Sequence, residues 1–335
     1  MDEAARGALA GLRLPHLSRL MARLAPLPRE ATAGNDPASD PGHPTGLSLS
    51  LPHERTLARA WGLPCQDGQM PWTAWREARV TETTSSDASN ASNASNASDS
   101  PPAAFARFTP CHWAVGSDHI ALRDPEALQL GDDESQALLA AMQPYFEEDG
   151  LQVRWDSALC WTARGEMLRA LPCASLDRVI GRRIDDWLSR TPAARPLRRL
   201  QQEMQMLLYT HPVNESREAL GLLPVNSFWV DGAGALPAGR STQAAQTIRL
   251  DDSLRRPALQ GDAAAWTAAW QALDAQLLAP LLAALDAGQA IHLTLAGEHH
   301  ATTFGPRTAT GLGGALAGLV ARWRAPSPAQ VLNTL

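Results

Sequence analysis

Apolar residues recur at helical spacing along much of the chain. Leucine at every third or fourth position forms a stripe in residues 11–27, and a longer stripe of Trp and Leu runs through residues 262–287. Pro280 lies inside the longer stripe, where it should kink the helix. The same periodicity, with suitable capping residues, predicts further helices over residues 51–63, 132–146, 177–188, 197–209, 215–220 and 315–323.

Short apolar and aromatic runs between these helices predict strands. They cover residues 106–116, 152–157, 160–165, 227–230 and 291–297. Strands that alternate with helices are typical of α/β proteins, so α/β is the fold class that we expect.

The composition is that of a globular protein with one large or two moderate domains. The chain has 335 residues, of which 44% are hydrophobic and 19% charged, and its net charge of -6 argues against general nucleic-acid binding. Every basic residue is Arg, which excludes the lysine-dependent phosphate loop and Schiff-base chemistry. Arg nevertheless binds phosphate and carboxylate well. Four cysteines without a Cys-x-x-Cys pair indicate reduced thiols.

Two stretches are too polar to contribute to a core. Residues 81–102 form a Ser/Asn/Ala repeat and residues 30–46 are rich in Gly, Pro and Asp, so both are predicted to be disordered surface loops. No apolar run approaches the roughly 18 residues of a membrane helix, and the N-terminus has no secretory signal. We therefore expect a cytoplasmic protein with no membrane partner.

The segment HPVNESREALGLLPVNSFWVDGAG, residues 211–234, concentrates hydrogen-bonding groups between a predicted helix and a predicted strand, and we call it the corner motif. On one interpretation it only builds the fold, with Asn214 capping a short helix and Gly221 ending it. On the other it holds a ligand, because α/β proteins often bind ligands beside glycines at strand ends. The candidate ligand-binding residues are His211, Asn214, Arg217, Asn226, Trp229, Gly232 and Gly234.

The corner motif resembles the archaeal-type cofactor-independent phosphoglycerate mutases, in which this region reads HPxNxxRxxxGxxPANxIWxWGxG. Val225 replaces the usual Ala and Asp231 replaces the second Trp. Nearly the whole chain is similar to the RpfE-type regulatory proteins of proteobacteria, a family often labelled phosphoglycerate mutase by similarity. The residues that carry this second resemblance are PHERTLARAWGLP (52–64), TPCHWAVGSDHIALRDP (109–125), ASLDRVIGR (174–182), LQQEMQMLLYTHPVN (200–214) and PVNSFW (224–229).

The resemblance implies an alkaline-phosphatase-like core with an inserted substrate-recognition domain. Residues 1–80 and 236–335 would form the core, residues 105–235 the inserted domain, and residues 81–104 a disordered insertion. The stretch ASLDRVIGRRI also resembles the PHDIxGKxI segment of the mutases. Through that likeness Arg182, or its neighbour Arg183, would stand near a basic residue of the family, and Arg182 joins the candidate ligand-binding residues.

The catalytic motifs of that superfamily are degraded in this chain. Its mutases use a hydroxyl nucleophile beside two divalent metals held by Asp and His. The family's early Asp-Gly is missing, and its late Asp-His-x-Thr-Pro is replaced by Gly297-Glu298-His299-His300. We therefore predict no catalytic residues and no cofactor. The alternative is a rebuilt site in which Glu298, His299 and His300 hold a divalent metal such as manganese.

Three functions follow from these observations as hypotheses. The first is a catalytically degenerate phosphoglycerate-mutase-like or RpfE-type regulatory protein that binds a small phosphorylated or carboxylate metabolite or a protein partner. The second is an active metal-dependent mutase or phosphatase. The third is a pure protein-interaction module. No segment resembles a helix-turn-helix, so we expect no nucleic-acid partner.

Overall fold

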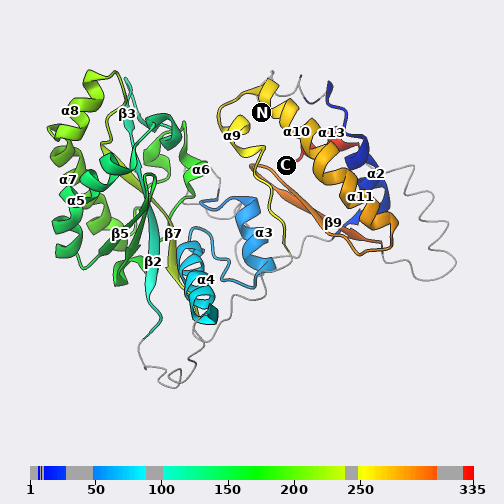
Figure 1. Ribbon diagram of the computed structural model, residues 1–335, viewed down its shortest axis with the longest axis horizontal. Helices are drawn as coiled ribbons and strands as arrows, with labels where there is room; N and C mark the ends of the chain where they lie inside the picture. The colour runs from blue at the N-terminus through cyan, green and yellow to red at the C-terminus, as the bar shows by residue number, and fades with distance from the viewer. Residues whose placement is uncertain are drawn as a thin grey trace. The chain divides into compact units, whose positions relative to one another are not determined.

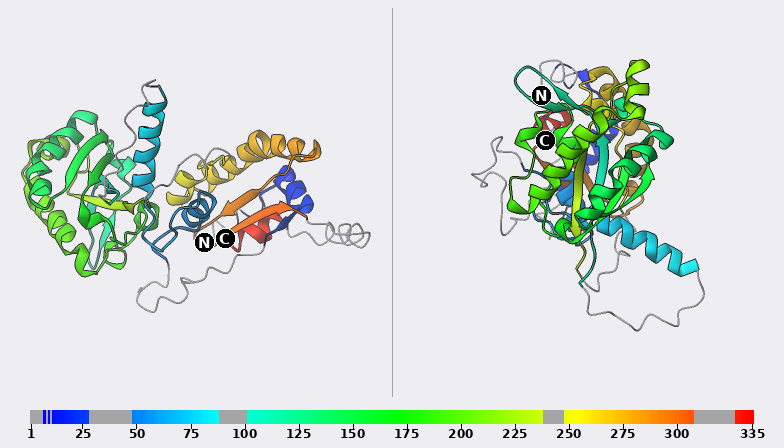
Figure 2. Two further views of the ribbon diagram at one scale, coloured as in Figure 1. Left: turned by 90° about the horizontal axis from the view of Figure 1, so that it is seen from below. Right: turned by 90° about the vertical axis from the view of Figure 1, so that its left-hand side faces the viewer.

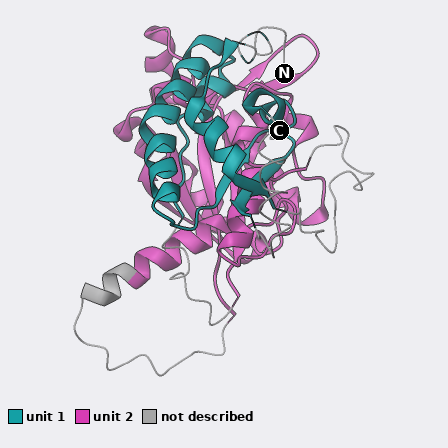
Figure 3. Ribbon diagram, turned by 90° about the vertical axis from the view of Figure 1, so that its right-hand side faces the viewer, with its two compact units in different colours: residues 1–33, 248–335 teal, residues 34–247 magenta. Residues whose placement is uncertain are grey.

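The chain folds into two units, one of which is inserted in sequence within the other. The structure, a computed structural model, describes residues 7, 9, 11–27, 48–87, 101–237, 248–307 and 327–335. Residues 1–33 and 248–335 belong to unit 1, and residues 34–247 belong to unit 2 (Figure 3).

Unit 2 is built on a four-stranded antiparallel sheet with strand order β5-β6-β2-β7. Helices α5 (Asp132–Glu148) and α7 (Arg195–Tyr209) pack on one face, and α4 (Trp72–Asp87) packs against β2 and β7 on the other (Figure 1). The strands are β2 (Ala104–Cys111), β5 (Gln152–Ser157), β6 (Cys160–Arg164) and β7 (Ser227–Ala235).

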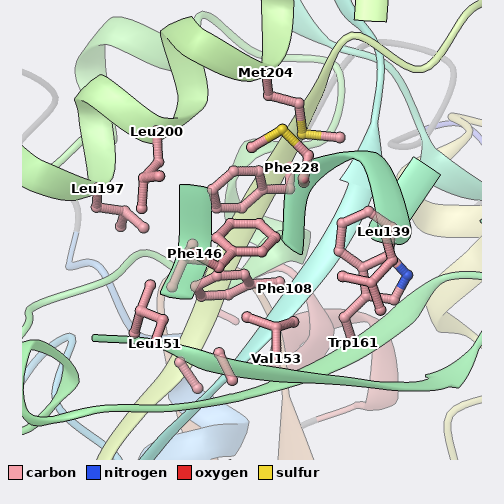
Figure 4. Close-up of a cluster of buried hydrophobic side chains, with 14 of the residues drawn as sticks. Phe108, Leu139, Phe146, Leu151, Val153, Trp161, Leu197, Leu200, Met204 and Phe228 are labelled. Atoms are coloured by element: carbon pink, nitrogen blue, oxygen red, sulfur yellow. The ribbon is translucent and has the colours of Figure 1, made fainter. Parts of the chain in front are cut away.

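The face of the sheet under α5 and α7 carries the hydrophobic core of unit 2. Phe108, Phe146 and Phe228, from β2, α5 and β7, are each 0% exposed, and their ring centroids lie 4.7, 5.5 and 5.7 Å apart (Figure 4). Leu200 and Met204 of α7 are also buried in this cluster. Burying a side chain of this size contributes roughly 1.5–3 kcal/mol, so the cluster holds both helices firmly against the sheet.

Shorter elements complete unit 2. They are α3 (Pro52–Ala60), the hairpin of β3 (Trp113–Val115) and β4 (Ile120–Leu122), α6 (Leu176–Val179), α8 (Pro212–Ala219), and the turns η2 (Pro125–Leu128), η3 (Glu166–Leu168), η4 (Ile184–Asp186) and η5 (Pro192–Ala194).

Unit 1 combines a three-stranded antiparallel sheet, in the order β1-β9-β8, with a long helix (Figure 2). Its core contains Leu17 and Leu20 of the N-terminal helix together with Trp270, Leu282 and Phe304. The elements are α2 (Pro15–Arg23), β1 (Leu24–Pro26), α9 (Arg255–Leu259), α10 (Ala263–Leu273), the π-helical turn η7 (Asp274–Leu278), α11 (Ala279–Asp286), β8 (Leu293–Ala296), β9 (Ala301–Pro306) and α13 (Pro328–Leu332).

A buried carboxylate in the long helix of unit 1 serves as the cap of a different helix. Asp274 is 4% exposed and accepts hydrogen bonds from the backbone N–H groups of His16 (3.2 Å) and Leu17 (2.9 Å), at the start of α2. Its Oδ2 also lies 2.8 Å from Nδ1 of His16. The N-cap residue of α2, Leu14, has no side-chain oxygen, so Asp274 satisfies donors that the local sequence leaves free.

The long helix of unit 1 differs from the expectation that no apolar segment is long enough to span a membrane. As a continuous helix, Ala263–Asp286 has 24 residues and a mean hydropathy of 1.2 in its best window, which is long and apolar enough to cross a membrane. The π-helical turn ends two residues before Pro280, which has no N–H for the helical ladder. That Pro280 kinks the helix stays a prediction.

Several predicted elements are confirmed and two are wrong. The helices expected at 132–146 and 197–209 appear as α5 and α7. The helix expected over residues 11–27 ends at Arg23, because residues 24–26 pair with β9. The helix expected over residues 177–188 is reduced to α6 and η4, since Gly181, with φ +73°, interrupts it.

The division of the chain also differs from the expected one. Residues 48–80 belong to unit 2, because α4 packs on its sheet and the Cys173 amide donates to Gly68 O at 2.8 Å. Part of the predicted disordered insertion continues α4 as far as Asp87. The segments 30–46, 88–100 and 315–323 lie outside the described residues.

The mixed α/β composition that we expected is confirmed. The three-stranded and the four-stranded sheet are both antiparallel throughout. Within the described residues, parallel pairing is limited to a single bridge between Leu122 and Ile180. The finer expectation of an alkaline-phosphatase-like core stays a prediction.

Replacing Asp274 by Ala should destabilise the protein by about 1–3 kcal/mol, because two backbone donors of α2, one of them buried, lose their acceptor. Urea denaturation of the full chain, followed by circular dichroism, measures the loss. The matched control is Gln276→Ala, an exposed position on the same helix. Equal midpoints for the two variants would contradict the capping role.

Candidate functional site

The corner motif begins with a helix cap and a buried amide. His211 is the N-cap of α8, where its Nδ1 accepts a hydrogen bond from Val213 N at 3.3 Å. Asn214, the expected cap, lies inside the helix instead. Its amide donates to the carbonyls of Leu208 (2.9 Å) and Val225 (2.8 Å) and accepts from Val225 N (2.9 Å). The Asn214 amide therefore ties the end of α7 to the segment that enters β7.

Arg217 is enclosed in the protein with its guanidinium fully engaged. The side chain is 0% exposed. Its Nε donates to Leu223 O at 2.9 Å, one terminal nitrogen donates to Glu134 Oε2 at 2.7 Å, and the other donates to Leu128 O. A ligand anion could reach this guanidinium only by displacing Glu134.

Asn226 and the two glycines position neighbouring segments. The Asn226 amide accepts from Trp113 N at 2.7 Å and donates to Trp113 O at 3.0 Å, which joins the β3–β4 hairpin to β7. Gly232 has φ +62° in a bulge of β7, and a Cβ there would lie 2.9 Å from Thr73 Oγ1. A Cβ at Gly234 would lie 3.1 Å from Pro71 Cβ. Both positions require glycine so that β7 can approach α4.

These contacts give the corner motif a structural role in unit 2. Asn214, Arg217 and Asn226 all use their polar atoms to hold backbone groups of the same unit. That these three residues also bind a ligand stays a prediction.

Trp229 lines a cleft that the sequence analysis did not predict. The side chain is 3% exposed and its indole N–H donates to Ala174 O at 2.9 Å. It lines a small opening with an internal volume of about 30 Å³, and we call this opening the Trp229 cleft. Most of its lining is apolar and includes Leu171, Trp187, Leu188, Leu197 and Val230.

Two polar side chains of α7, Gln201 and Arg198, line the Trp229 cleft. Gln201 is 2% exposed, and its Nε2 donates to Phe228 O at 2.9 Å, whereas its Oε1 accepts no hydrogen bond from the described part of the chain. Arg198, half-buried and one turn earlier on the same helix face, forms no ion pair with a described carboxylate. An Arg without an ion-pair partner, set among apolar side chains, can hold an anion, so this cleft is a candidate binding site.

Two arginines pack against Trp187, which lines the cleft. The guanidinium carbons of Arg178 and Arg182 each lie 5.9 Å from the ring centroid of Trp187, within the range of cation–π attraction. Arg178 is anchored by donation from its Nε to Ser48 O at 3.0 Å. Arg182, a predicted ligand residue, thus packs on a residue of the cleft wall and does not itself line the cleft.

A second polar cluster surrounds the first turn of α3. Glu54 Oε2 accepts hydrogen bonds from Leu51 N at 2.7 Å and from the Ser175 hydroxyl. Burial raises the pKa of Glu54 to about 7, and the negative charges of Asp231 and Asp177 act in the same direction. The Glu54 carboxyl is therefore partly protonated at neutral pH.

The proposed metal ligands lie on the turn between β8 and β9. The backbone N–H groups of His299 and His300 donate to Leu335 O at 2.8 and 2.9 Å, and the two imidazole centroids are 6.5 Å apart. Among the residues that the structure describes, no three His, Cys, Asp or Glu side chains gather as a metal-binding group. That Glu298, His299 and His300 form a rebuilt metal site stays a prediction.

Comparisons with known proteins give a weak likeness among solved structures. No protein-family model and no curated protein matches the chain. Among solved structures, the cofactor-independent phosphoglycerate mutase of Thermoplasma acidophilum is similar, with 14% identity and a TM-score of 0.34, over 91% of this chain and 84% of that protein. A TM-score of that size does not define a shared fold, and the RpfE-type assignment has no counterpart in these comparisons.

The sequence interpretation found Trp229 but missed its partners in the cleft. Arg198 and Gln201 occupy ordinary positions of an amphipathic helix, and Trp187 lies in a segment predicted as helix. The local sequence does not show whether an Arg will form an ion pair, because the carboxylates that pair with arginines can lie in distant parts of the chain. Glu54 was readable as a helix-capping residue, since it is the third residue of α3.

Replacing Arg217 by Ala should destabilise unit 2 by about 3–5 kcal/mol, because Glu134 is left without its cation and two carbonyls lose their donor. Guanidinium denaturation measures this change. The control is Arg169→Ala, which removes an exposed ion pair with Glu166 and should alter stability little. A similarly small effect at Arg217 would refute its structural role.

Replacing Glu54 by Gln should stabilise the protein above neutral pH. The folded state raises the pKa of Glu54 from 4.5 to about 7, so it holds the proton more tightly than the unfolded chain. Stability from this group is complete below pH ~4.5 and is lost as pH rises to ~7. The variant should gain up to about 3 kcal/mol at pH 8 and nothing at pH 4.5.

Urea denaturation of both proteins at a series of pH values measures this difference. Glu166→Gln, at an exposed carboxylate paired with Arg169, is the control and should leave the pH profile unchanged between pH 5 and 8. Parallel profiles of wild type and Glu54→Gln would show that the carboxyl is not perturbed.

Proposed function

We propose that this chain is a phosphoglycerate-mutase-like protein that has lost catalysis and binds a small carboxylate or phosphorylated metabolite. Binding takes place in the Trp229 cleft of unit 2. The observation that carries the proposal is that Arg198, which forms no ion pair with a described carboxylate, lines the same cleft as Gln201 and two indoles. A charged hydrogen bond from Arg holds an anion in such a setting, and the apolar walls exclude water from it.

The loss of catalysis rests on the sequence. The family's early Asp-Gly and late Asp-His-x-Thr-Pro supply ligands for two metals, and neither motif is retained. Substrate-domain features persist more completely, since His211, Asn214, Arg217 and Asn226 match the family pattern. A protein with these properties serves regulation, through a ligand-dependent change in its own stability or in its contact with a protein partner.

Thermal unfolding with 3-phosphoglycerate, related phospho-metabolites and simple carboxylates tests the proposal, each in chelator and in manganese. A ligand at ~100 times its dissociation constant should stabilise the protein by ~2.7 kcal/mol and raise the midpoint by several degrees. We expect the shift in chelator as well. The variant Arg198→Gln should abolish the shift, whereas Arg195→Gln, at an exposed position outside the cleft, should keep it.

Two results would contradict the proposal. A shift that requires manganese would revive the active enzyme and contradict the loss of catalysis. The absence of a shift with every anion would overturn small-anion binding and leave a protein partner as the alternative. The exposed Met206 and Tyr209 of α7, at 80% and 84%, would then be the candidate contact residues.

A further inference from the structure

Helix α7 exposes a regular stripe of side chains on the side that faces away from the core of unit 2. Its leucines and Met204 are buried in the core or packed against it. The exposed residues of the helix, which we call the α7 stripe, are Arg195, Arg199, Gln202, Met206 and Tyr209. They are four, three, four and three positions apart, which is the heptad spacing of a helix that packs along another helix. The α7 stripe is therefore ordered like one half of a helix–helix contact.

The α7 stripe changes from basic to apolar along its length. Arg195 and Arg199 occupy its first half, whereas its second half ends in Met206 and Tyr209, which are 80% and 84% exposed. Two large apolar side chains one turn apart on the same face are typical of a contact surface. An open groove of about 450 Å³ runs beside the middle of the stripe, against Tyr145 of α5, and has room for side chains from a partner.

The α7 stripe is complementary to a copy of itself that runs in the opposite direction. When two copies lie antiparallel with Gln202 at the centre, Arg195 of each copy faces Tyr209 of the other, and Arg199 faces Met206. A guanidinium is attracted to the face of a Tyr ring, and the aliphatic stem of Arg packs against Met. A two-fold axis repeats both contacts, as a closed dimer requires.

The charges beside the α7 stripe follow the same symmetry. Within one copy, Glu203 lies one turn after Arg199, at 3.6 Å, on the flank next to the groove. In the antiparallel arrangement, Arg199 of each copy also faces Glu203 of the other. Helix α5 lacks this property, because Asp133 and Glu147 at its exposed ends would face like charges. The complementarity therefore belongs to α7 and specifies a second copy of this chain.

We propose that this protein forms a dimer through the α7 stripe, with the two α7 helices antiparallel about a two-fold axis at Gln202. The inference goes beyond the proposed function, because the stripe lies on a different face of α7 from Arg198 and Gln201 in the Trp229 cleft. A contact along one helix of 15 residues is small, so the dimer is reversible and its affinity is in the micromolar range.

Sedimentation velocity of the full chain tests the dimer, at concentrations up to about 200 µM so that a small, transient interface is covered. The wild type should change from monomer to dimer within this range. Tyr209→Ala should weaken the dimer about tenfold, because two cation–π contacts are lost. Val115→Ala, at an 83% exposed position on β3, is the control and should leave the dissociation constant unchanged. A wild type that stays monomeric throughout would overturn the proposal.

An exchange of charges tests the antiparallel arrangement. Arg199→Glu and Glu203→Arg should each weaken the dimer about tenfold, because like charges then face each other across the axis. An equimolar mixture of the two variants should form dimers again, since every facing pair is then of opposite charge. Circular dichroism of each variant checks that it is folded. Repulsion within one copy is the same in the mixture, so a structural role of either residue would not be relieved by mixing.

Two further results would contradict the proposal. A mixture that remains as weakly associated as each variant alone would overturn the antiparallel contact of Arg199 with Glu203. A dimer of wild-type affinity in both Tyr209→Ala and Arg199→Glu would show that the chains associate through another surface.

Discussion

The buried guanidinium of Arg217 is the interaction on which the corner of unit 2 depends. A charge removed from water is costly unless it is paired and hydrogen-bonded, and here Glu134 provides the charge while two backbone carbonyls accept the remaining bonds. The three acceptors come from η2, α5 and the loop before β7. With the Asn214 amide, this network determines where α7 ends and how the chain enters β7.

The Trp229 cleft is a consequence of that placement. Because α7 is held against β7 at its end and by the aromatic cluster along its length, Gln201 reaches Phe228 O and Arg198 faces the neighbouring opening. The polar residues of unit 2 thus divide into two groups. Those of the corner motif hold backbone groups of the protein, whereas those of the cleft have hydrogen-bonding capacity left for a ligand.

The absence of Lys gives arginine an unusually broad structural role. Arg217 and Arg178 donate to backbone carbonyls from several nitrogens at once, which a single ammonium group could not do with the same geometry. Arg178 and Arg182 also support an indole ring, and Arg107 holds Asp231 near Glu54. An arginine that makes no such contact, as at position 198, therefore stands out among the described residues of its wall.

The sequence by itself determined the elements whose periodicity is strong, including α5, α7 and the long helix of unit 1, and it located the corner motif. It did not determine the end of α2, because residues 24–26 become a strand only when β9 lies beside them. The sequence also predicted Asn214 as the cap of α8, which is wrong. The Asn214 amide donates instead to two carbonyls that lie outside this helix. Which arginine is buried, which is paired and which is open was decided by the tertiary structure alone, because a salt bridge such as that of Arg217 with Glu134 joins residues far apart in sequence.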